Sequence, residues 1–533
     1  MDTQIDTPTV NSRHTSGWFT SLRARLHVVD WEAASVKRIV GVAAFVLPFF
    51  LYVATLAPTI YNLDSAELTT AVASNGIIRA TGYPLYLVLG KVWSWLPVGD
   101  MGYRLNLFSA FCGALTILLA DRILRRLQVG GWARLGALGL LATAPFFWAL
   151  SLIAEVYTLH TALMAAVILA LLRWAHKPSP FHLALPIFLM TLSLGNHAAT
   201  VLLVPGCLWV VLMSHPRQLL QPRVWVAALT AVLLGVSVFL VLPLRYAAQP
   251  AFNYAGMYDA AGIFQPVNLQ TWAGIWWLIS GKSFAGQMFG YVGTAVWSEV
   301  WAYLGQLWLA FLIVGIGPGL VGLIVLWRRH WRLSGMLTLM FLANAIFYIN
   351  YRVVDKSTMF LPTYVIWALW LGVGYQFVFD WLKESGEWRL EMKAISNLRS
   401  PISILRIAIV SSLLLALLLN WGRVDRSNDW STRQQSEEIL ALAEPNALIF
   451  GWWDTVPAIQ YLQLVEGQRG DVTAVNRFLI SGDDMNHLIL AELGHRPIYI
   501  NNPSVELLQH VTVRPVGPLY LLEPRITSLE TNR

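Results

Sequence analysis

Charged residues are scarce in this chain of 533 amino acids. Asp, Glu, Lys and Arg together make up only 13% of it, well below the ~25% usual in soluble globular domains. So few charges cannot cover a water-facing surface, which excludes a cytosolic enzyme, a coiled coil and a disordered chain. Apolar residues instead reach 56%, with 25 Trp among them, and this composition predicts an integral membrane protein.

Cysteine is also rare, and the excess of positive charge is small. The two cysteines, Cys112 and Cys207, lie in apolar runs, so neither a disulfide framework nor a thiolate metal site is expected. The net charge is +7, yet the tail 422–533 holds 9 Arg against 14 acidic residues. We therefore expect no nucleic-acid partner, and we assign the excess positive charge to the lipid headgroups of one membrane face.

Long stretches without charged residues predict the membrane spans, because a spanning helix needs about 20 mainly apolar residues. Eleven spans are expected, at 39–57, 105–120, 135–150, 156–172, two within 183–213, 224–244, 300–327, 333–351, 362–379 and 407–421. The segment Tyr83–Leu96 is shorter and contains Lys91. As a span it would place three arginines on the outer side, so the positive-inside rule favours an interfacial helix.

This assignment of spans orients the chain in the membrane. The inner segments then hold 21 Lys and Arg and the outer loops 7, which places the N-terminus in the cytoplasm, of a bacterial plasma membrane by expectation. The expected organisation is a cytoplasmic segment 1–38, a transmembrane domain 39–421 and an extracytoplasmic domain 422–533. The transmembrane domain includes a first outer loop 58–103 and a large outer loop 245–299. Short apolar runs alternate with helical patterns in the tail, which predicts a small α/β fold there.

Ionisable residues near a membrane are costly and are candidates for function, and in this topology the unusual ones lie on the outer side. Asp64 and Glu67 follow the first span at a spacing of three, which places both carboxylates on one face of a helix. Two close carboxylates raise one pKa and suit a general base. The same pair would also suit a divalent cation or the capping of an interfacial helix.

Four further residues on the same side are site candidates, each with a structural alternative. Glu155 opens a span and suits a helix start, and His197 lies in a turn. Arg245 would hold a phosphate with its fork of donors or reach the interface as many arginines do. Asp355 would join the site or pair with the adjacent Lys356. Convergence of these groups on one cavity would make a binding site.

Several short motifs, taken together and in order, resemble a known family. They are Asp64–Leu68 (DSAEL), Thr81–Tyr86 (TGYPLY), Arg104–Ala110 (RLNLFSA), Glu155–Leu159 (EVYTL), Ser193–His197 (SLGNH), Leu242–Arg245 (LPLR) and, in the tail, Gly451–Asp454 (GWWD). The chain resembles the domain-of-unknown-function 2723 family, also classified as glycosyltransferase family 117, whose animal member is a protein O-mannosyltransferase. The resemblance covers roughly residues 40–480.

The resemblance implies a GT-C fold and transfer of a sugar from a polyprenyl-phosphate donor to an acceptor hydroxyl of a protein, lipid or glycan. The reaction would take place on the non-cytoplasmic face and invert the anomeric carbon. It makes Asp64, with Glu67, the catalytic acidic residues, and Tyr83 and Arg104 substrate-binding candidates. Arg245 or His197 would stabilise the leaving phosphate. No cofactor is required, although a divalent metal at the two acids is possible.

One departure from the family concerns the residues before the Gly-Tyr-Pro motif. Many members carry His-Pro there, whereas this chain has Arg79-Ala80, and Arg79 is a candidate to replace that histidine by pairing with the donor phosphate. Two other functions stay open at this point. A transporter or lipid flippase would need ionisable groups near the middle of the bilayer, and a catalytically inactive relative would keep the fold as a scaffold.

Overall fold

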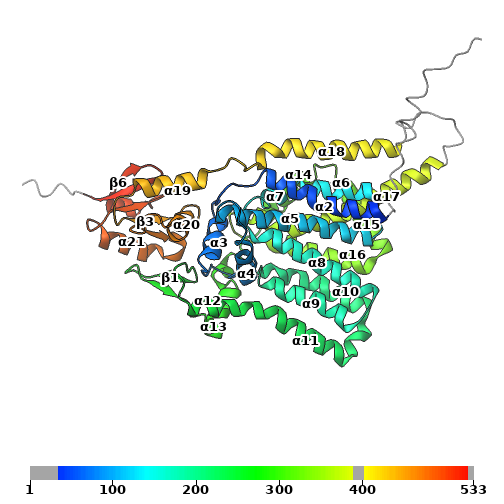
Figure 1. The fold of residues 1–533 in the computed structure, drawn as a ribbon, viewed down its shortest axis with the longest axis horizontal. Helices are drawn as coiled ribbons and strands as arrows, with labels where there is room; N and C mark the ends of the chain where they lie inside the picture. The colour runs from blue at the N-terminus through cyan, green and yellow to red at the C-terminus, as the bar shows by residue number, and fades with distance from the viewer. Residues whose placement is uncertain (1–33, 388–400, 526–533) are drawn as a thin grey trace, which may run out of the picture.

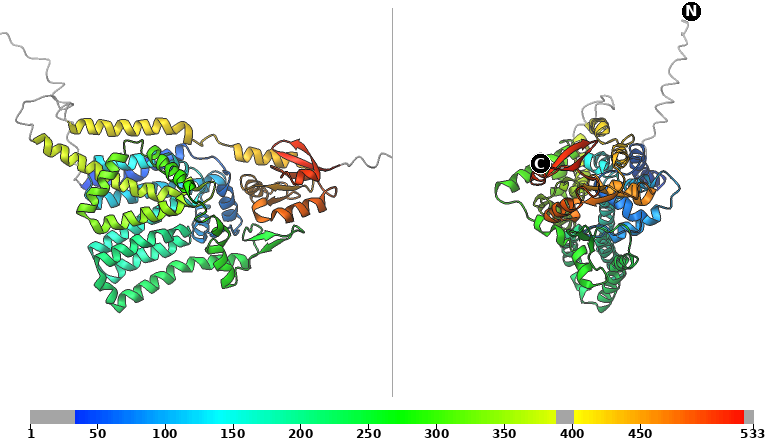
Figure 2. Two further views of the ribbon diagram at one scale, coloured as in Figure 1. Left: turned by 180° about the vertical axis from the view of Figure 1, so that it is seen from behind. Right: turned by 90° about the vertical axis from the view of Figure 1, so that its left-hand side faces the viewer.

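The computed structural model describes residues 34–387 and 401–525. It has two parts, a bundle of long helices and a small α/β domain at one end of the bundle (Figures 1 and 2). The helices of the bundle are α2 (Ala34–Ala54), α5 (Met101–Arg126), α6 (Gly131–Ala142), α7 (Pro145–Ala149), α8 (Val156–His176), α9 (Pro180–Leu194), α10 (Val204–Ser214), α11 (Pro222–Val236), α12 (Val241–Ala247), α14 (Thr294–Ala310), α15 (Ile316–Arg329), α16 (Trp331–Ile349), α17 (Leu361–Glu387) and α18 (Pro401–Val424).

Six of the described helices are long and apolar enough to cross a membrane: Met101–Arg126, Val156–His176, Pro222–Ala247, Trp331–Ile349, Lys356–Ser385 and Pro401–Val424. Their exposure differs with position. The apolar window of α8 is 72% buried within the protein, whereas that of α18 is only 11% buried. α8 therefore lies in the centre of the bundle, and α18 runs along its outside with an apolar surface that suits lipid (Figure 1). The chain is a multi-pass membrane protein.

Two of the eleven predicted spans are interrupted. The segment 300–327 is divided between α14 and α15, and Leu312 and Ile313 between them have φ of 51° and 61°, which no right-handed helix contains. The segment 135–150 breaks between α6 and α7. The count of eleven crossings thus stays a prediction. Helix α4 (Pro84–Trp93) has 10 residues, too few to span a bilayer, which favours the interfacial alternative.

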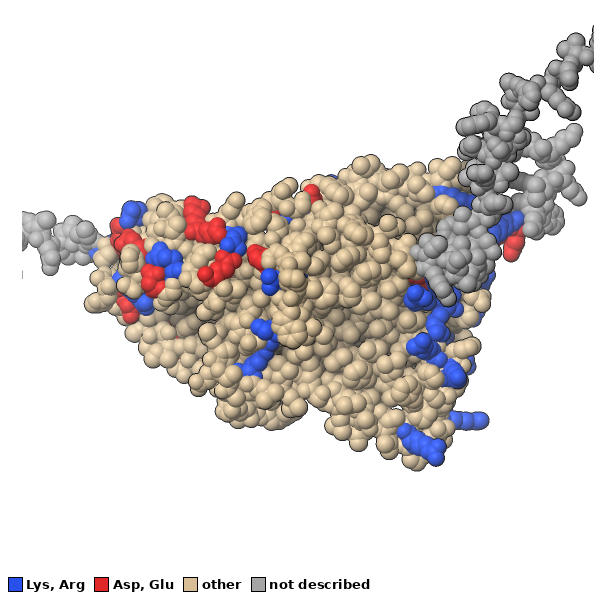
Figure 3. All heavy atoms as spheres, viewed as in Figure 1, with Lys and Arg blue, Asp and Glu red and all other residues tan. Residues whose placement is uncertain are grey.

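Lys and Arg side chains gather at the end of the bundle that lies away from the α/β domain (Figure 3). This end is formed by the last turns of α5, α8 and α15 and the first turn of α16. Arg126, Arg173, Arg329 and Arg332 lie there, all of them on segments expected to face the cytoplasm. The α/β domain at the other end carries charges of both signs (Figure 3).

The C-terminal part folds around a five-stranded sheet, which confirms the small α/β fold expected for the tail. Its strands lie in the order β4-β3-β5-β7-β6, with β3 parallel to β4 and β5, and β7 antiparallel to β5 and β6. The elements are α19 (Ser431–Leu442), β3 (Leu448–Gly451), α20 (Val456–Glu466), β4 (Thr473–Asn476), α21 (Gly482–Glu492), β5 (Ile498–Ile500), β6 (Val511–Val516) and β7 (Leu519–Pro524).

The two outer loops join this domain to the bundle. Helix α3 (Asp64–Ala73) of the first loop packs against α20, and its Ala66 shares an apolar core with Val456 and Ile459. The large loop contains a hairpin of β1 (Gly256–Tyr258) and β2 (Phe264–Pro266), followed by α13 (Trp272–Ile279). Just before the hairpin, the Tyr254 hydroxyl donates a hydrogen bond to Gln460 of α20 (2.5 Å). These contacts hold the α/β domain against α3, the helix that carries Asp64 and Glu67.

Candidate active site

The acid pair lies in the first turn of α3. Asp64 is the first residue of the helix, and the cap position before it is Leu63, with a φ of 56° and no capping hydrogen bond from its side chain. Asp64 is therefore not the capping residue that its spacing from Glu67 allowed. Its carboxylate turns instead to Arg79, as does that of Glu67.

Arg79 binds both acids at once. Its Nη2 lies 2.5 Å from Asp64 Oδ1 and its Nη1 lies 3.0 Å from Glu67 Oε2, while its backbone N–H donates to Glu67 Oε1 at 3.1 Å. The guanidinium carbon also lies 3.8 Å from the ring centre of Trp453, in the α/β domain, a distance typical of cation–π contact. Two carboxylates that share one guanidinium leave one negative charge in excess.

Glu67 is the more deeply placed acid, with only 2% of its surface exposed. Burial raises the pKa of Glu67 to about 7, although the charge of Arg79 acts in the opposite direction; the nearby Asp64 raises it further. Glu67 thus changes its charge near neutral pH, whereas Asp64, with 16% of its side chain exposed, is the more accessible of the two acids.

The far end of α3 is held by two cations. Lys91 Nζ donates to the carbonyl of Ala73 (3.0 Å) and Arg245 Nη1 to that of Gly76 (2.7 Å). Positive charge at the C-terminal end of a helix and carboxylates at its start both complement the helix dipole. Arg245 therefore positions α3 and lines neither of the cavities described below, contrary to the expectation that it would meet the phosphate.

Arg104 also has a structural place. Its guanidinium donates to the carbonyls of Ser94 (2.9 Å), Val98 (2.9 Å) and Gly99 (3.1 Å), and so fixes the turn between α4 and α5. The side chain faces this turn rather than the acid pair, and Arg104 is not among the residues that line the cavities described below.

Two cavities meet at the acid pair. The first, of about 690 Å³, lies against the α/β domain and is called the domain-side cavity. The second, of about 290 Å³, lies among the helices and is called the bundle-side cavity. Both are lined by Asp64, Arg79, Phe284, Val353 and Asp355. A group bound in either cavity therefore reaches Asp64.

The bundle-side cavity combines apolar walls with a few polar groups. Its apolar lining includes Val201, Leu202, Phe347 and Met359, and its polar lining includes Tyr83, Tyr157 and His197. Burial lowers the pKa of His197 to about 4, so the ring is neutral at physiological pH. Its Nδ1 accepts a hydrogen bond from the Ala199 N–H (3.1 Å), which assigns the proton to Nε2. His197 is thus an uncharged donor in this cavity.

The domain-side cavity is built largely from aromatic side chains. Trp452, Trp453, Asp454 and Phe478 come from the α/β domain, and Arg352 from the segment after α16. The four residues from the α/β domain were not among the expected site residues, whereas Arg352 belongs to the outer-side ionisable groups that the sequence singles out. The sequence did carry a signal for three of them, since two tryptophans followed by Asp454 come directly after the buried strand β3.

Asp355 and Glu155 complete the polar surroundings. Asp355 lines both cavities, and Lys356 pairs with Glu299 instead (2.5 Å). Burial and the charge of Asp64 raise the pKa of Asp355. Glu155 is 8% exposed and is not among the residues that line either cavity. Burial, followed by the charges of Asp64 and Asp355, raises the pKa of Glu155 well above the usual range.

The two acids were also candidates to hold a metal ion. In the structure Arg79 takes the position between them that a cation would take. Within residues 34–387 and 401–525, no group of three or more His, Cys, Asp or Glu side chains has an arrangement that would hold a metal. The positive charge that the structure places next to Asp64 is the guanidinium of Arg79.

Comparisons with known proteins agree with the resemblance seen in the motifs. Residues 64–220 match the model of the protein O-mannosyl-transferase TMEM260 N-terminal domain. The protein O-mannosyl-transferase tmem260 of Dictyostelium discoideum is 20% identical over 482 residues, which are 83% of this chain and 57% of that protein. Its Mus musculus counterpart TMEM260 is 28% identical over 179 residues, which are 33% of this chain and 25% of that protein. The family resemblance is confirmed. The matched part of this chain spans little more than half the length of the Dictyostelium discoideum protein and a quarter of the length of the Mus musculus protein.

The fold has a counterpart among solved structures. ArnT from Cupriavidus metallidurans, in a structure bound to undecaprenyl phosphate, superimposes with a TM-score of 0.57 at 13% identity, covering 92% of this chain and 98% of ArnT. Its apo structure gives a TM-score of 0.54. The chain therefore has the GT-C fold of membrane glycosyltransferases.

Proposed function

We propose that this protein is a membrane glycosyltransferase that moves a sugar from a polyprenyl-phosphate donor to an acceptor hydroxyl. The single observation that carries the proposal is the meeting of two cavities at Asp64, one among apolar helices and one against the α/β domain. A transferase of this kind needs separate entries for a lipid donor and a water-borne acceptor, with one proton acceptor between them.

The donor is assigned to the bundle-side cavity. Its apolar walls suit the first isoprene units of the lipid, and Arg79 is the one Lys or Arg among the residues that line it. Arg79 and His197 are then the groups that meet the donor phosphate, in place of Arg245. The ArnT structure was bound to undecaprenyl phosphate, which supports a donor of this class.

In the proposed reaction Asp64 accepts the proton of the acceptor hydroxyl as that oxygen attacks the anomeric carbon. The bond between this carbon and the phosphate oxygen breaks, and the departing polyprenyl phosphate carries the negative charge. Arg79 stabilises that charge, an electrostatic contribution that is usually large in enzymes. Attack opposite the leaving phosphate inverts the anomeric carbon, and the step is written without a metal.

The acceptor is assigned to the domain-side cavity. The two relatives described above are protein O-mannosyl-transferases, so we propose a serine or threonine hydroxyl of a polypeptide as acceptor and mannose as the sugar. The aromatic wall of Trp452, Trp453 and Phe478 suits an extended chain. The site then faces the non-cytoplasmic side, because the basic end of the bundle lies opposite (Figure 3).

A catalytically inactive relative is the second candidate, favoured by the pairing of Arg79 with both acids. One assay separates the two. Purified protein in nanodiscs receives polyprenyl-phosphate mannose and a threonine-containing peptide, and mannosyl peptide is measured by mass spectrometry. Product from the wild type that Asp64→Asn fails to form supports the transferase. Absence of product with mannose, glucose and other polyprenyl-phosphate sugars would contradict it.

A further inference from the structure

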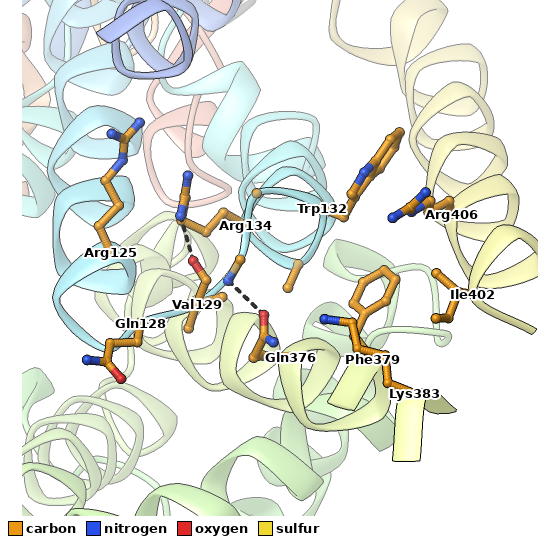
Figure 4. Close-up of a pocket in the computed structure, with 13 residues that line it drawn as sticks. Arg125, Gln128, Val129, Trp132, Arg134, Gln376, Phe379, Lys383, Ile402 and Arg406 are labelled. Atoms are coloured by element: carbon orange, nitrogen blue, oxygen red, sulfur yellow. Dashed lines mark hydrogen bonds between the residues drawn. The ribbon is translucent and has the colours of Figure 1, made fainter. Parts of the chain in front are cut away.

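A third hollow, of about 590 Å³, lies at the end of the bundle opposite the acid pair. It is formed by the turn between α5 and α6 together with α17 and α18 (Figure 4). We call it the basic hollow and define it by Arg125, Trp132, Arg134, Lys383 and Arg406. Nothing in the proposed transfer reaction uses it.

Four of the residues that line the basic hollow are cations, and none of the lining residues is Asp or Glu. Two of the four, Arg125 and Arg134, share the buried Asp121, which is 1% exposed and accepts from Arg125 Nε at 2.6 Å and from Arg134 Nε at 2.8 Å. Lys383 and Arg406 are the other two cations of the lining. The hollow therefore presents basic side chains to a bound group.

Apolar side chains form the remaining wall. Trp132, Phe379 and Ile402 line the same hollow, and the guanidinium carbon of Arg406 lies 5.4 Å from the ring centre of Trp132. Arg406 and Lys383 reach toward the space from two different helices (Figure 4). Cations beside an apolar wall suit an amphiphile better than a free anion, because the wall offers nothing to a hydrated phosphate.

The surface next to the basic hollow is exposed and apolar. Ile404 and Ile407 on α18 are 58% and 52% exposed, and α18 as a whole lies outside the bundle (Figure 1). Basic pockets between membrane helices recognise phosphate-bearing headgroups. We propose that the basic hollow binds the phosphate headgroup of an anionic phospholipid, whose acyl chains lie along α18.

Native mass spectrometry of the full-length protein tests this directly. The protein is mixed with phosphatidylglycerol or with phosphatidylcholine, and the bound lipids are counted for the wild type and for Lys383→Ala/Arg406→Ala. We expect the double variant to bind phosphatidylglycerol about 10- to 30-fold more weakly, the effect of two basic side chains near a membrane surface. Phosphatidylcholine binding should stay unchanged, and Lys383→Arg/Arg406→Lys should retain wild-type binding.

The matched control is Arg217→Ala/Arg223→Ala, which removes two exposed cations near the start of α11, outside the basic hollow. Equal loss in this control would mean general attraction to the basic face and would overturn the proposal. Unchanged phosphatidylglycerol binding in the hollow variant would overturn it as well. Displacement of the lipid by millimolar inorganic phosphate would identify a free-phosphate site instead.

Discussion

The two ends of the helical bundle use the same ion-pair chemistry in opposite proportions. Beside the α/β domain, two carboxylates share the guanidinium of Arg79. At the basic end, two guanidiniums share the carboxylate of Asp121. Buried charges need partners, and each end supplies them by sharing one ion between two of opposite sign. The first group lies next to two cavities, and the second lies beside the basic hollow. We propose proton acceptance at the first group and anion binding at the second.

The largest effect is expected from Asp64→Asn, which keeps the shape of the side chain and removes its ability to accept a proton. We expect sugar transfer to fall by about 10²- to 10⁴-fold, the usual range for loss of a general base. The measurement is the initial rate of mannosyl-peptide formation. Asp483→Asn, on an exposed turn of α21, serves as the control and should match the wild type.

Arg79→Ala should reduce stability more than any other single change at the site. It leaves Glu67 buried without its cation, and breaking a buried ion pair from one side costs about 3–5 kcal/mol. The free energy of unfolding in mild detergent is the quantity to measure. Arg514→Ala, which breaks an exposed pair with Glu523, should cost less than about 1 kcal/mol; an equal loss in both variants would contradict the account.

Asp121→Asn tests whether the basic end of the bundle affects sugar transfer at the opposite end. The change leaves Arg125 and Arg134 without their shared carboxylate, so we expect the free energy of unfolding to fall by about 3 kcal/mol. The rate of sugar transfer by the folded protein should not change, because Asp121 lies at the opposite end of α5 from the acid pair. A loss of transfer parallel to that of Asp64→Asn would refute this separation.

Trp453→Ala removes the aromatic ring that covers Arg79 from the α/β domain. We expect the KM for the peptide acceptor to rise about 10-fold, in line with the contribution of a cation–π contact and an aromatic wall, while the KM for the donor stays near the wild-type value. Trp430→Ala, a half-exposed tryptophan before α19, is the matched control. Equal rises in the KM for the peptide and in the KM for the donor would contradict the assignment of acceptor and donor to separate cavities.

The smallest expected effect is a change in the pH profile. Because burial raises the pKa of Glu67 to about 7, Glu67 is neutral in acid and ionised above neutral pH, where it strengthens the hold on Arg79. The rate of the wild type should therefore rise as pH increases through 7. In Glu67→Gln this rise in rate through pH 7 should disappear. If the rise persisted in the variant, another group would be responsible for it.

The sequence predicted the membrane class, the α/β tail and the shared helix face of Asp64 and Glu67, because each depends on composition or on short-range spacing. It also brought Asp64, Tyr83, His197 and Asp355 together, and all four line the bundle-side cavity. Their roles stay predictions. The partners of Arg79 and Arg245 were missed, since both depend on how the loop after α3 folds back. The place of Trp453 required the docking of a domain far along the chain.

The breaks in the predicted spans have a similar cause. Hydropathy measures whether a segment is apolar, and 300–327 is mostly apolar and has no charged residue. It does not register the backbone turn at Leu312 and Ile313, because neither residue type favours a positive φ. Tertiary packing fixes that turn, so no local sequence pattern predicted it.

A cryo-electron-microscopy map of the protein with a polyprenyl phosphate would show directly whether the donor binds beside Asp64 and Arg79. We expect phosphate density within hydrogen-bond distance of Arg79, with the lipid chain running along Leu202 and Phe347 of the bundle-side cavity. Phosphate density at the basic hollow, with the space beside Asp64 and Arg79 left empty, would contradict it.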